Sequence, residues 1–312
     1  MPDNRDGNDL WGITCYFNPA GYRRRLTNYR LFRERLIVPL VTVELAYGDD
    51  FALDDKDAEV LVHLRGKDIL WQKERLLNIA LNALPDSCRK VVWLDCDVIF
   101  QTDDWPSRTS LLLDRSMLVQ PFSHLYHSPG DWGPDEELPF GSEPLQSAPL
   151  LIASGIPATT CMGARASQIG CVHGFAWAAA RDLLREHRFY DACIMGGGDS
   201  VMLRAAYGYF DDAVRIQQMN SQQRTHYLSW AEAFHNAVRS NVGFVEGNLV
   251  HLWHGSREHR RYADRYQELA RFQFDPFKDI ARDDNGAWRW NSNKGEMHEY
   301  VRAYFLARRE DG

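Results

Sequence analysis

The 312-residue sequence lacks the features that mark several classes of protein. Its six cysteines form no C-x-x-C pair, and they are scattered at positions 15, 88, 96, 161, 171 and 193. Such spacing is typical of free thiols in a reducing compartment rather than of a zinc site or a disulfide framework. No apolar run approaches the roughly 20 residues that a membrane-spanning helix needs. The polar lead, residues 1–9, also lacks the apolar core of a signal peptide.

Positive charge is not in excess. The chain has 43 Asp and Glu against 36 Lys and Arg, which gives a formal net charge of −7. A general phosphate-attracting surface for nucleic acid is therefore not expected. Internal repeats and low-complexity tracts are absent as well. These absences predict a soluble, cytoplasmic protein with no membrane span and no nucleic-acid partner, and its length suits a single large domain.

What the sequence does contain is an alternation of strand-like and helix-like segments. Apolar, partly β-branched stretches predict strands at 10–17, 38–45 and 90–100. Apolar residues at helical spacing predict helices over 21–36 and 69–84, the second of which ends at Pro85. A strand, a helix and a second strand in close succession predict an α/β fold. We expect a Rossmann-like, mixed but mainly parallel sheet flanked by helices.

The second half of the chain has a different character. Seven prolines between positions 121 and 157, with many serines and glycines, predict that 121–170 is a long irregular loop or lid. Beyond it the expected elements are helices over 174–187 and 195–208, a last strand within 243–255, and two charged helices near 257–270 and 295–309.

Two aspartates follow the strand predicted at 90–100. Asp95 and Asp97 flank Cys96 directly after the apolar run VVWL. In open α/β sheets, ligands bind at the carboxyl ends of the strands. Burying two neighbouring carboxylates without a partner would be costly, and hard oxygen ligands at a strand end suit Mg²⁺ or Mn²⁺ holding a diphosphate. A plain turn or capping role is the alternative interpretation.

Two further motifs could complete such a site. Asp199 follows three glycines in GGGDS at the start of an expected helix, so it is either an N-cap or a functional carboxylate beside a turn that a ligand approaches closely. His251 and His254 lie in HLWHG, near the end of an expected strand. An imidazole there would supply the metal ligand that the two aspartates lack.

In this order, the motifs resemble the β-1,4-galactosyltransferase family. WQKERLLNIALNAL and VVWLDCDVIF are similar to its helix and D-x-D strand, GFAWAAARDLL and YDACIMGGGDSVM to its acceptor-side segment, and HLWHGSREHRRY to its metal-binding histidine segment. The resemblance covers residues 10–100 and 171–265. It implies a GT-A fold and the inverting transfer of a sugar from a nucleotide sugar, expected to be UDP-linked, to a hydroxyl of a glycan or glycolipid.

The resemblance also implies roles for individual residues. Asp97 and His254 would bind Mn²⁺ or Mg²⁺, with His251 as the reserve ligand, and Asp95 would lie at the metal and the nucleotide. Asp199 would be the catalytic base that deprotonates the acceptor hydroxyl. The other implied contacts are Phe17, Arg23, Glu44, Asp95 and Cys96 for the donor, and Trp177, Gly197 and Gly198 for the acceptor. Because Gly198 replaces the glutamate that precedes the family's base, the family's acceptor sugar is not carried over.

By the same resemblance, residues 10–120 would form the nucleotide-sugar-binding half and residues 171–270 the acceptor and catalytic half. Residues 271–312 would form a C-terminal helical segment. The 121–170 segment has no counterpart in the family, and the membrane anchor of the animal enzymes is absent from this sequence. This implies a bacterial relative that acts on a cytoplasmic glycan precursor.

Three other interpretations fit parts of the sequence. LDCDV is similar to the start of haloacid-dehalogenase-like phosphatases, whose first aspartate is a phosphorylated nucleophile, but that family normally opens its domain with this strand. A sugar nucleotidylyltransferase needs a glycine-rich basic loop after the first strand, and NPAGYRRR lacks paired glycines. A non-catalytic carbohydrate-binding protein would suit the ten tryptophans. It would not need a base such as Asp199.

Overall fold

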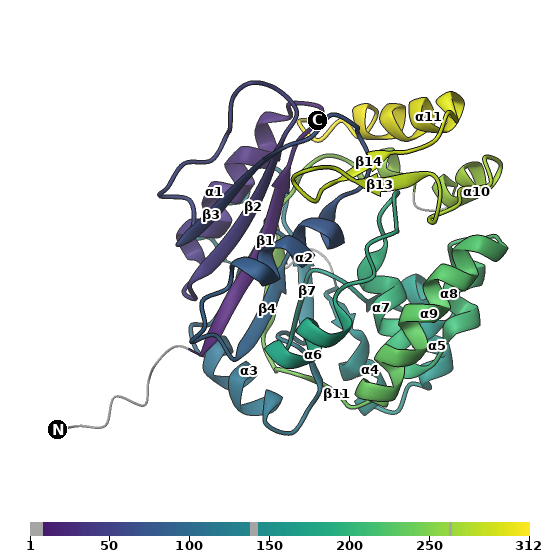
Figure 1. Ribbon diagram of the computed structural model, residues 1–312. Helices are drawn as coiled ribbons and strands as arrows, with labels where there is room; N and C mark the ends of the chain where they lie inside the picture. The colour runs from purple at the N-terminus through teal and green to yellow at the C-terminus, as the bar shows by residue number, and fades with distance from the viewer. Residues whose placement is uncertain (1–8, 138–142, 262–263) are drawn as a thin grey trace.

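The computed structural model describes residues 9–137, 143–261 and 264–312. It contains two main β-sheets and a small hairpin, surrounded by helices (Figure 1). The larger sheet has the strand order β11 (Val242–Phe244), β6 (Leu118–Gln120), β10 (Ala176–Ala180), β4 (Lys90–Leu94), β1 (Leu10–Phe17), β2 (Leu40–Ala46) and β3 (Val60–Arg65). The smaller sheet has the order β5 (Val98–Phe100), β12 (Asn248–His251), β7 (His124–His127), β8 (Leu145–Ser147) and β9 (Cys171–Val172). The hairpin pairs β13 (Ile280–Arg282) with β14 (Trp288–Trp290).

Helices lie between most of these strands in the sequence. The α-helices are α1 (Arg23–Arg35), α2 (Lys73–Ala83), α3 (Trp105–Leu113), α4 (Ala148–Ala153), α5 (Ala158–Met162), α6 (Arg181–His187), α7 (Gly198–Tyr207), α8 (Phe210–Ile216), α9 (Ser221–Val238), α10 (Arg265–Ala270) and α11 (Gly295–Leu306). Two short 3₁₀ turns are η1 (Ala166–Ile169) and η2 (Arg257–Arg260). None of the described helices combines the length and the apolar character that a bilayer crossing requires.

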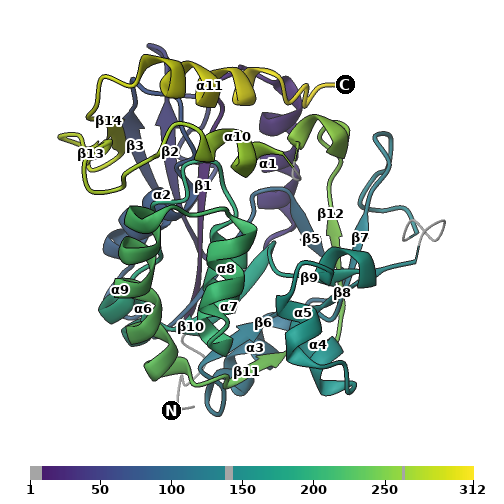
Figure 2. The ribbon, with the colours of Figure 1, turned by 90° about the vertical axis from the view of Figure 1, so that its right-hand side faces the viewer.

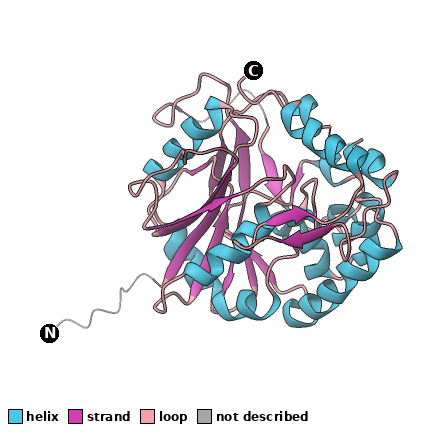
Figure 3. Ribbon diagram, turned by 45° about the horizontal axis from the view of Figure 1, so that its top comes forward, coloured by secondary structure: helices cyan, strands magenta, loops and turns pink. Residues whose placement is uncertain are grey.

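The larger sheet is mainly parallel, as the sequence predicted. β1 pairs in parallel with β2 and β4, and β10 runs antiparallel to its neighbours β4 and β6. Helices pack on both of its sides (Figure 3). The residues of β4 explain this arrangement, because Val91 and Trp93 belong to one buried cluster, and Val92 and Leu94 belong to a second one on the opposite face. A strand buried on both faces is a continuous apolar run rather than an alternating one.

Residues 90–100, predicted as one strand, form two strands in different sheets. β4 ends at Leu94 and β5 begins at Val98. Between them, the N–H of Asp95 donates to the carbonyl of Phe175 at 2.7 Å, whereas the carbonyl of Asp97 accepts from the N–H of Leu252 at 2.8 Å. The backbone therefore changes partners between the two aspartates, which lie at the junction of the two sheets.

The helix predicted over 174–187 begins as a strand. Residues 176–180 form β10, and the helix α6 starts only at Arg181. Alanine favours a helix, but Ala176, Ala178 and Ala179 are fully buried between β4 and β6. Sheet pairing in the core outweighs the local propensity here.

The 121–170 segment is not irregular throughout. It contains β7, β8, α4, α5 and η1, and β7 pairs with both β12 and β8. Pro149 lies in the first turn of α4, where a missing N–H costs no helical hydrogen bond. Residues 138–142 of this segment lie outside the described residues.

The predictions for the last part were partly right. The strand expected within 243–255 is β12, preceded by the separate strand β11. The helix near 257–270 is broken into η2 and α10, with residues 262–263 outside the described residues. Figure 2 shows α11 lying above α10, with the following residues ending beside α1. Their contact is direct, because the N–H of Arg24 in α1 donates to Oδ1 of Asp311 at 2.8 Å.

Candidate active site

One carboxylate and two imidazoles converge at the junction of the two sheets. Asp97 follows β4, His251 is the last residue of β12, and His254 lies three residues later. The Nε2 atom of His254 is 3.2 Å from Oδ2 of Asp97 and 3.0 Å from Nε2 of His251. The potential ligand atoms of the three residues lie within 4.8 Å of one another. The structure thus brings together Asp97 and both histidines that the sequence offered as alternatives.

These residues fit a divalent cation. The Oδ1 atom of Asp97 is buried and accepts no hydrogen bond among the described residues, which suits an additional electrophilic partner. Burial lowers the pKa of His254 to about 4, so its ring is neutral at pH 7, the form in which imidazole binds a metal. Two imidazoles with one carboxylate favour Mn²⁺ or another transition metal over Mg²⁺, which prefers oxygen ligands.

Neighbouring side chains fix the ring of His251. The Nδ1 atoms of His127 and His251 are 3.0 Å apart, and the two residues are register partners on β7 and β12. The Phe175 ring packs against His251 at a centroid distance of 4.9 Å. If His251 binds a cation through Nε2, its Nδ1 carries the hydrogen and donates to His127, a common support for metal-binding histidines.

A buried lysine joins the other two aspartates. Lys73, the first residue of α2, places Nζ 2.5 Å from Oδ1 of Asp95 and 2.7 Å from Oδ2 of Asp199. Burial alone would lower the pKa of Lys73, but the two aspartates outweigh it and hold this pKa well above its usual value. The D-x-D pair is therefore divided, since Asp97 faces the histidines and Asp95 faces Lys73. Lys73 lies in the segment WQKERLLNIALNAL, but the sequence analysis gave this residue no role.

The three glycines before Asp199 accommodate protein side chains. A Cβ atom at Gly196 would lie 3.3 Å from the Trp71 ring, and one at Gly197 would lie 2.3 Å from the Tyr266 hydroxyl. The φ angles of these two glycines are +85° and +91°, which disfavour any other residue. The expectation that the glycines let a ligand approach is not supported, because other parts of the chain occupy this space.

Gly198 faces a buried glutamate. A Cβ atom at Gly198 would lie 2.0 Å from Oε1 of Glu74, whose Oε2 accepts a hydrogen bond from the indole N–H of Trp71 at 2.9 Å. Burial, with a contribution from the nearby Asp199, outweighs Lys73 and raises the pKa of Glu74 to about 8. A second carboxyl group, which the sequence analysis did not single out, thus lies beside Asp199. Gly197 and Gly198 were expected to contact the acceptor. In the structure, the space where their Cβ atoms would lie is occupied by the side chains of Tyr266 and Glu74.

Some residues expected at the substrates have roles within the protein. Trp177 is 0% exposed in β10 and donates its indole N–H to the carbonyl of His173, so it cannot contact an acceptor here. Glu44 is also buried, and its two oxygens accept the N–H groups of Ala52 and Leu53 at 2.7 and 3.1 Å. The Glu44 carboxylate therefore holds the loop after β2, which is a structural reason for an acid at this strand end.

The remaining donor-side residues lie near the end of β1. Phe17 is buried, with its ring edge-on to Trp71 at 5.5 Å. Arg23 is exposed at the start of α1, where its N–H donates to the carboxylate of Asp311 at 3.2 Å. Burial, with Asp97 as the next cause, raises the pKa of the Cys96 thiol to about 12, so this group is neutral at pH 7.

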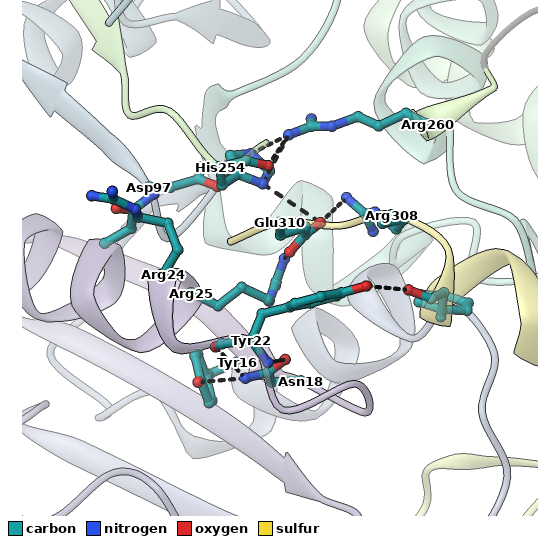
Figure 4. A network of polar contacts seen from close by, with 12 residues as sticks. Tyr16, Asn18, Tyr22, Arg24, Arg25, Asp97, His254, Arg260, Arg308 and Glu310 are labelled. Carbon is teal, nitrogen blue, oxygen red and sulfur yellow. Dashed lines mark hydrogen bonds and ion pairs between the residues drawn. The ribbon is translucent and has the colours of Figure 1, made fainter. Parts of the chain in front are cut away.

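Glu310, which the sequence analysis missed, lies beside His254 and between Arg25 and Arg308 (Figure 4). Its Oε2 is 3.0 Å from Nη1 of Arg25, and its Oε1 is 2.7 Å from Nη2 of Arg308 and 3.5 Å from Nδ1 of His254. Arg260 approaches the same ring, with Nη2 2.8 Å from Nδ1 and 2.6 Å from Nε2. No local pattern marks Glu310, because two of its partners, Arg25 and His254, lie far away in the sequence.

No family model matches the chain, and no curated protein matches it by sequence. Among solved structures, TarS 1–349 of S. aureus is similar at 12% identity and a TM-score of 0.37, over 72% of this chain and 70% of that one. The mannosyltransferase PcManGT of Pyrobaculum calidifontis, in complex with GDP-Man and Mn²⁺, is similar at 15% identity and a TM-score of 0.42, over 85% of this chain and 62% of that one. The 4-diphosphocytidyl-2C-methyl-D-erythritol synthase of Anaerococcus prevotii gives 12% identity and a TM-score of 0.36, over 83% and 96%. Similarities this low do not by themselves establish a family.

Proposed function

We propose that this chain is a metal-dependent glycosyltransferase of GT-A type, which moves a hexose from a nucleotide sugar to a hydroxyl of a glycan or glycolipid with inversion. The observation that carries the proposal is the convergence of Asp97, His251 and His254 at the carboxyl end of β4. Asp95 and Asp199 share Lys73 at the same strand end. A metal-binding group and a candidate base are then parts of one site.

The chemistry of these residues suits sugar transfer. A cation held by Asp97 and the two histidines would neutralise the charge of a departing nucleoside diphosphate. Asp199 would accept the proton of the acceptor hydroxyl as that oxygen attacks the sugar from the side opposite the diphosphate. Lys73 offsets the charges of Asp95 and Asp199, and it fixes the direction of the Asp199 carboxylate. Positioning of this kind supplies much of the rate in such a displacement.

Mn²⁺, a UDP-linked donor and a β-1,4-galactosyltransferase-like family are the finer parts of this proposal. The two imidazoles support Mn²⁺, and the order of the D-x-D, GGGDS and HLWHG motifs supports the family. A cytoplasmic location also belongs to the proposal, and it suits six cysteines that are all free thiols. The phosphatase alternative has less support, because phosphatase Mg²⁺ sites need oxygen ligands rather than two imidazoles.

A panel of UDP- and GDP-linked sugars, titrated by calorimetry with and without Mn²⁺, tests the proposal. We expect one donor to bind in a Mn²⁺-dependent manner and the Asp97→Ala variant to lose that binding, because this change removes the carboxylate ligand. Asp103→Ala is the matched control, since Asp103 is an exposed aspartate of the same region. Unchanged donor affinity in Asp97→Ala, or binding that ignores Mn²⁺, would contradict the metal assignment.

A further inference from the structure

Glu310 is buried among charged partners although it lies outside any helix or strand. Its side chain is 1% exposed and lies between the guanidinium groups of Arg25 and Arg308. The neighbouring backbone packs tightly on the residue after His254, because a Cβ atom at Gly255 would lie 2.4 Å from the carbonyl oxygen of Arg309. The position of the Glu310 carboxylate beside the His254 ring is therefore fixed by both charge and packing.

The hydrogen on His254 decides whether this ring can bind a cation. A neutral imidazole carries one hydrogen, on either Nδ1 or Nε2, and offers a lone pair on the other nitrogen. Nε2 of His254 faces Asp97 and His251, so binding there requires the lone pair on Nε2 and the hydrogen on Nδ1. Glu310 presents only acceptor atoms to Nδ1, with Oε1 3.5 Å away, and therefore favours this form. The Asp97 carboxylate, 3.2 Å from Nε2, favours the other form until a cation lies between them.

Arg260 has the opposite preference. Its guanidinium only donates, and its Nη2 lies within hydrogen-bond distance of both ring nitrogens of His254. A hydrogen on Nδ1 restricts Arg260 to Nε2, the position that a cation would take, so Arg260 has to withdraw when a cation binds. Glu310 and Arg260 therefore compete for Nδ1 of His254, because Glu310 accepts a hydrogen there and Arg260 donates one.

We propose that Glu310 is a positioning residue that holds the His254 hydrogen on Nδ1 and thereby directs the Nε2 lone pair toward the cation. This inference rests on the metal site of the proposed function. Arg25 and Arg308 keep the carboxylate in place and leave its Oε1 edge directed at the ring. Outer partners of this kind commonly change metal affinity by roughly 10- to 100-fold.

The experiment measures Mn²⁺ affinity without nucleotide, from the electron paramagnetic resonance signal of free Mn²⁺. Glu310→Met keeps the length of the side chain and removes the acceptor, so we expect affinity to fall about 10- to 100-fold. Glu310→Gln retains one acceptor oxygen and should lose less. Asp311→Asn is the matched control, because Asp311 belongs to the same segment but accepts the N–H groups of Arg23 and Arg24 instead of facing His254. We expect its affinity to stay within about twofold of the wild type.

Nitrogen-15 spectra of the metal-free protein give a second readout of the His254 hydrogen. The Asp97 carboxylate draws the hydrogen to Nε2 in the metal-free protein, so the two forms coexist. We expect the share with the hydrogen on Nδ1 to be larger in the wild type than in Glu310→Met, or than in Glu310→Gln if the methionine variant does not fold. The inference is overturned if this share is the same in wild type and variant. It is also overturned if Mn²⁺ affinity is unchanged in the Glu310 variants, or if Asp311→Asn loses as much affinity as they do. A wild-type protein that binds no Mn²⁺ would instead refute the metal site itself, and the role of Glu310 with it.

Discussion

Asp199 is the residue that separates a catalytic protein from one that only binds sugars. A helix cap would need its carboxylate on the backbone of the first turn, yet α7 has no side-chain cap and Oδ2 of Asp199 contacts Lys73. Its neighbour Glu74 is a second carboxyl group with a raised pKa. A carboxylate pair beside a lysine is costly to bury in a purely structural role, which favours a function in proton transfer.

The Asp199→Asn variant tests this role at the scale of one residue. Asparagine keeps the shape of the side chain but cannot accept the proton, so kcat should fall by about 10²-fold or more, or roughly 2.7 kcal/mol of barrier. Mn²⁺ and donor affinity should persist, because they depend on Asp97 and the histidines. Initial rates and calorimetry on the same preparation check both parts, with the exposed Asp211→Asn as the control. A kcat within a few-fold of the wild type would rule out Asp199 as the base.

Individual site residues could be predicted where a short pattern marks them. Asp97, Asp199 and the two histidines stand at the ends of apolar segments or beside glycines, and the structure places the histidines around Asp97. Lys73, Glu74 and Glu310 carry no such mark. Lys73 and Glu74 occur in a helix whose pattern predicts only its apolar face, and Glu310 meets Arg25 and His254 only through packing of distant segments. Chain folding, not local sequence, gives these three residues their place in the site.

At the scale of elements, the turn at Gly174 and Phe175, just before β10, contacts several residues of the candidate site. Phe175 precedes this strand with a φ of +77°, its carbonyl accepts the N–H of Asp95, and its ring lies against His251. A positive φ costs a non-glycine residue about 1–2 kcal/mol. The adjacent Gly174 leaves 3.2 Å between an added Cβ atom and Oδ2 of Asp199. This one turn therefore contacts Asp95, Asp199 and His251.

Two substitutions at Phe175 separate backbone strain from the packing of the ring. Phe175→Ala and Phe175→Gly both remove the ring, but only glycine adopts a positive φ freely. We expect the free energy of unfolding, measured with urea, to be about 1 kcal/mol higher for the glycine variant than for the alanine variant. Ala178, in the regular part of β10, is the control, and there a change to glycine should destabilise the protein. An alanine variant at 175 as stable as the glycine variant would show that this turn is not strained.

The elements were predictable where local pattern and burial agree. The helix α2 ends one residue before the Leu84-Pro85 step, and β1 and β2 are mostly apolar segments, so their existence followed from the sequence. β10 shows the limit. Its alanines have the local preference of a helix, and only its place between two strands makes it a strand.

At the scale of the whole molecule, the second sheet changes the interpretation of residues 121–170. β7 lies in this segment, pairs with β12 and supplies His127 to the Nδ1 atom of His251. Part of the expected lid is therefore built into the support of the candidate metal site. This sheet was not predictable, because β5 and β12 have only three and four residues and pair across a long stretch of chain.

Hydrogen exchange can show which part of residues 121–170 is held in the sheet and which part moves. We expect β7 to be protected as strongly as β12 in the free protein, because its backbone groups pair on both sides. Residues 130–137 should exchange fast and slow down when Mn²⁺ and a nucleotide sugar bind, if they cover the donor. Mass spectrometry of the free and loaded protein measures both. Equal, fast exchange in β7 and in 130–137 would contradict the paired sheet.

The ion pair between Arg25 and Glu310 joins residues 285 positions apart in the chain. A contact this distant forms late in folding, since the entropy of closing the intervening loop must be met first. During synthesis on the ribosome, Asp97, His251 and His254 all emerge before Glu310. A nascent chain can therefore gather the three candidate ligands before their outer carboxylate exists, and full affinity for the cation would be gained only once residue 310 has been made and docked.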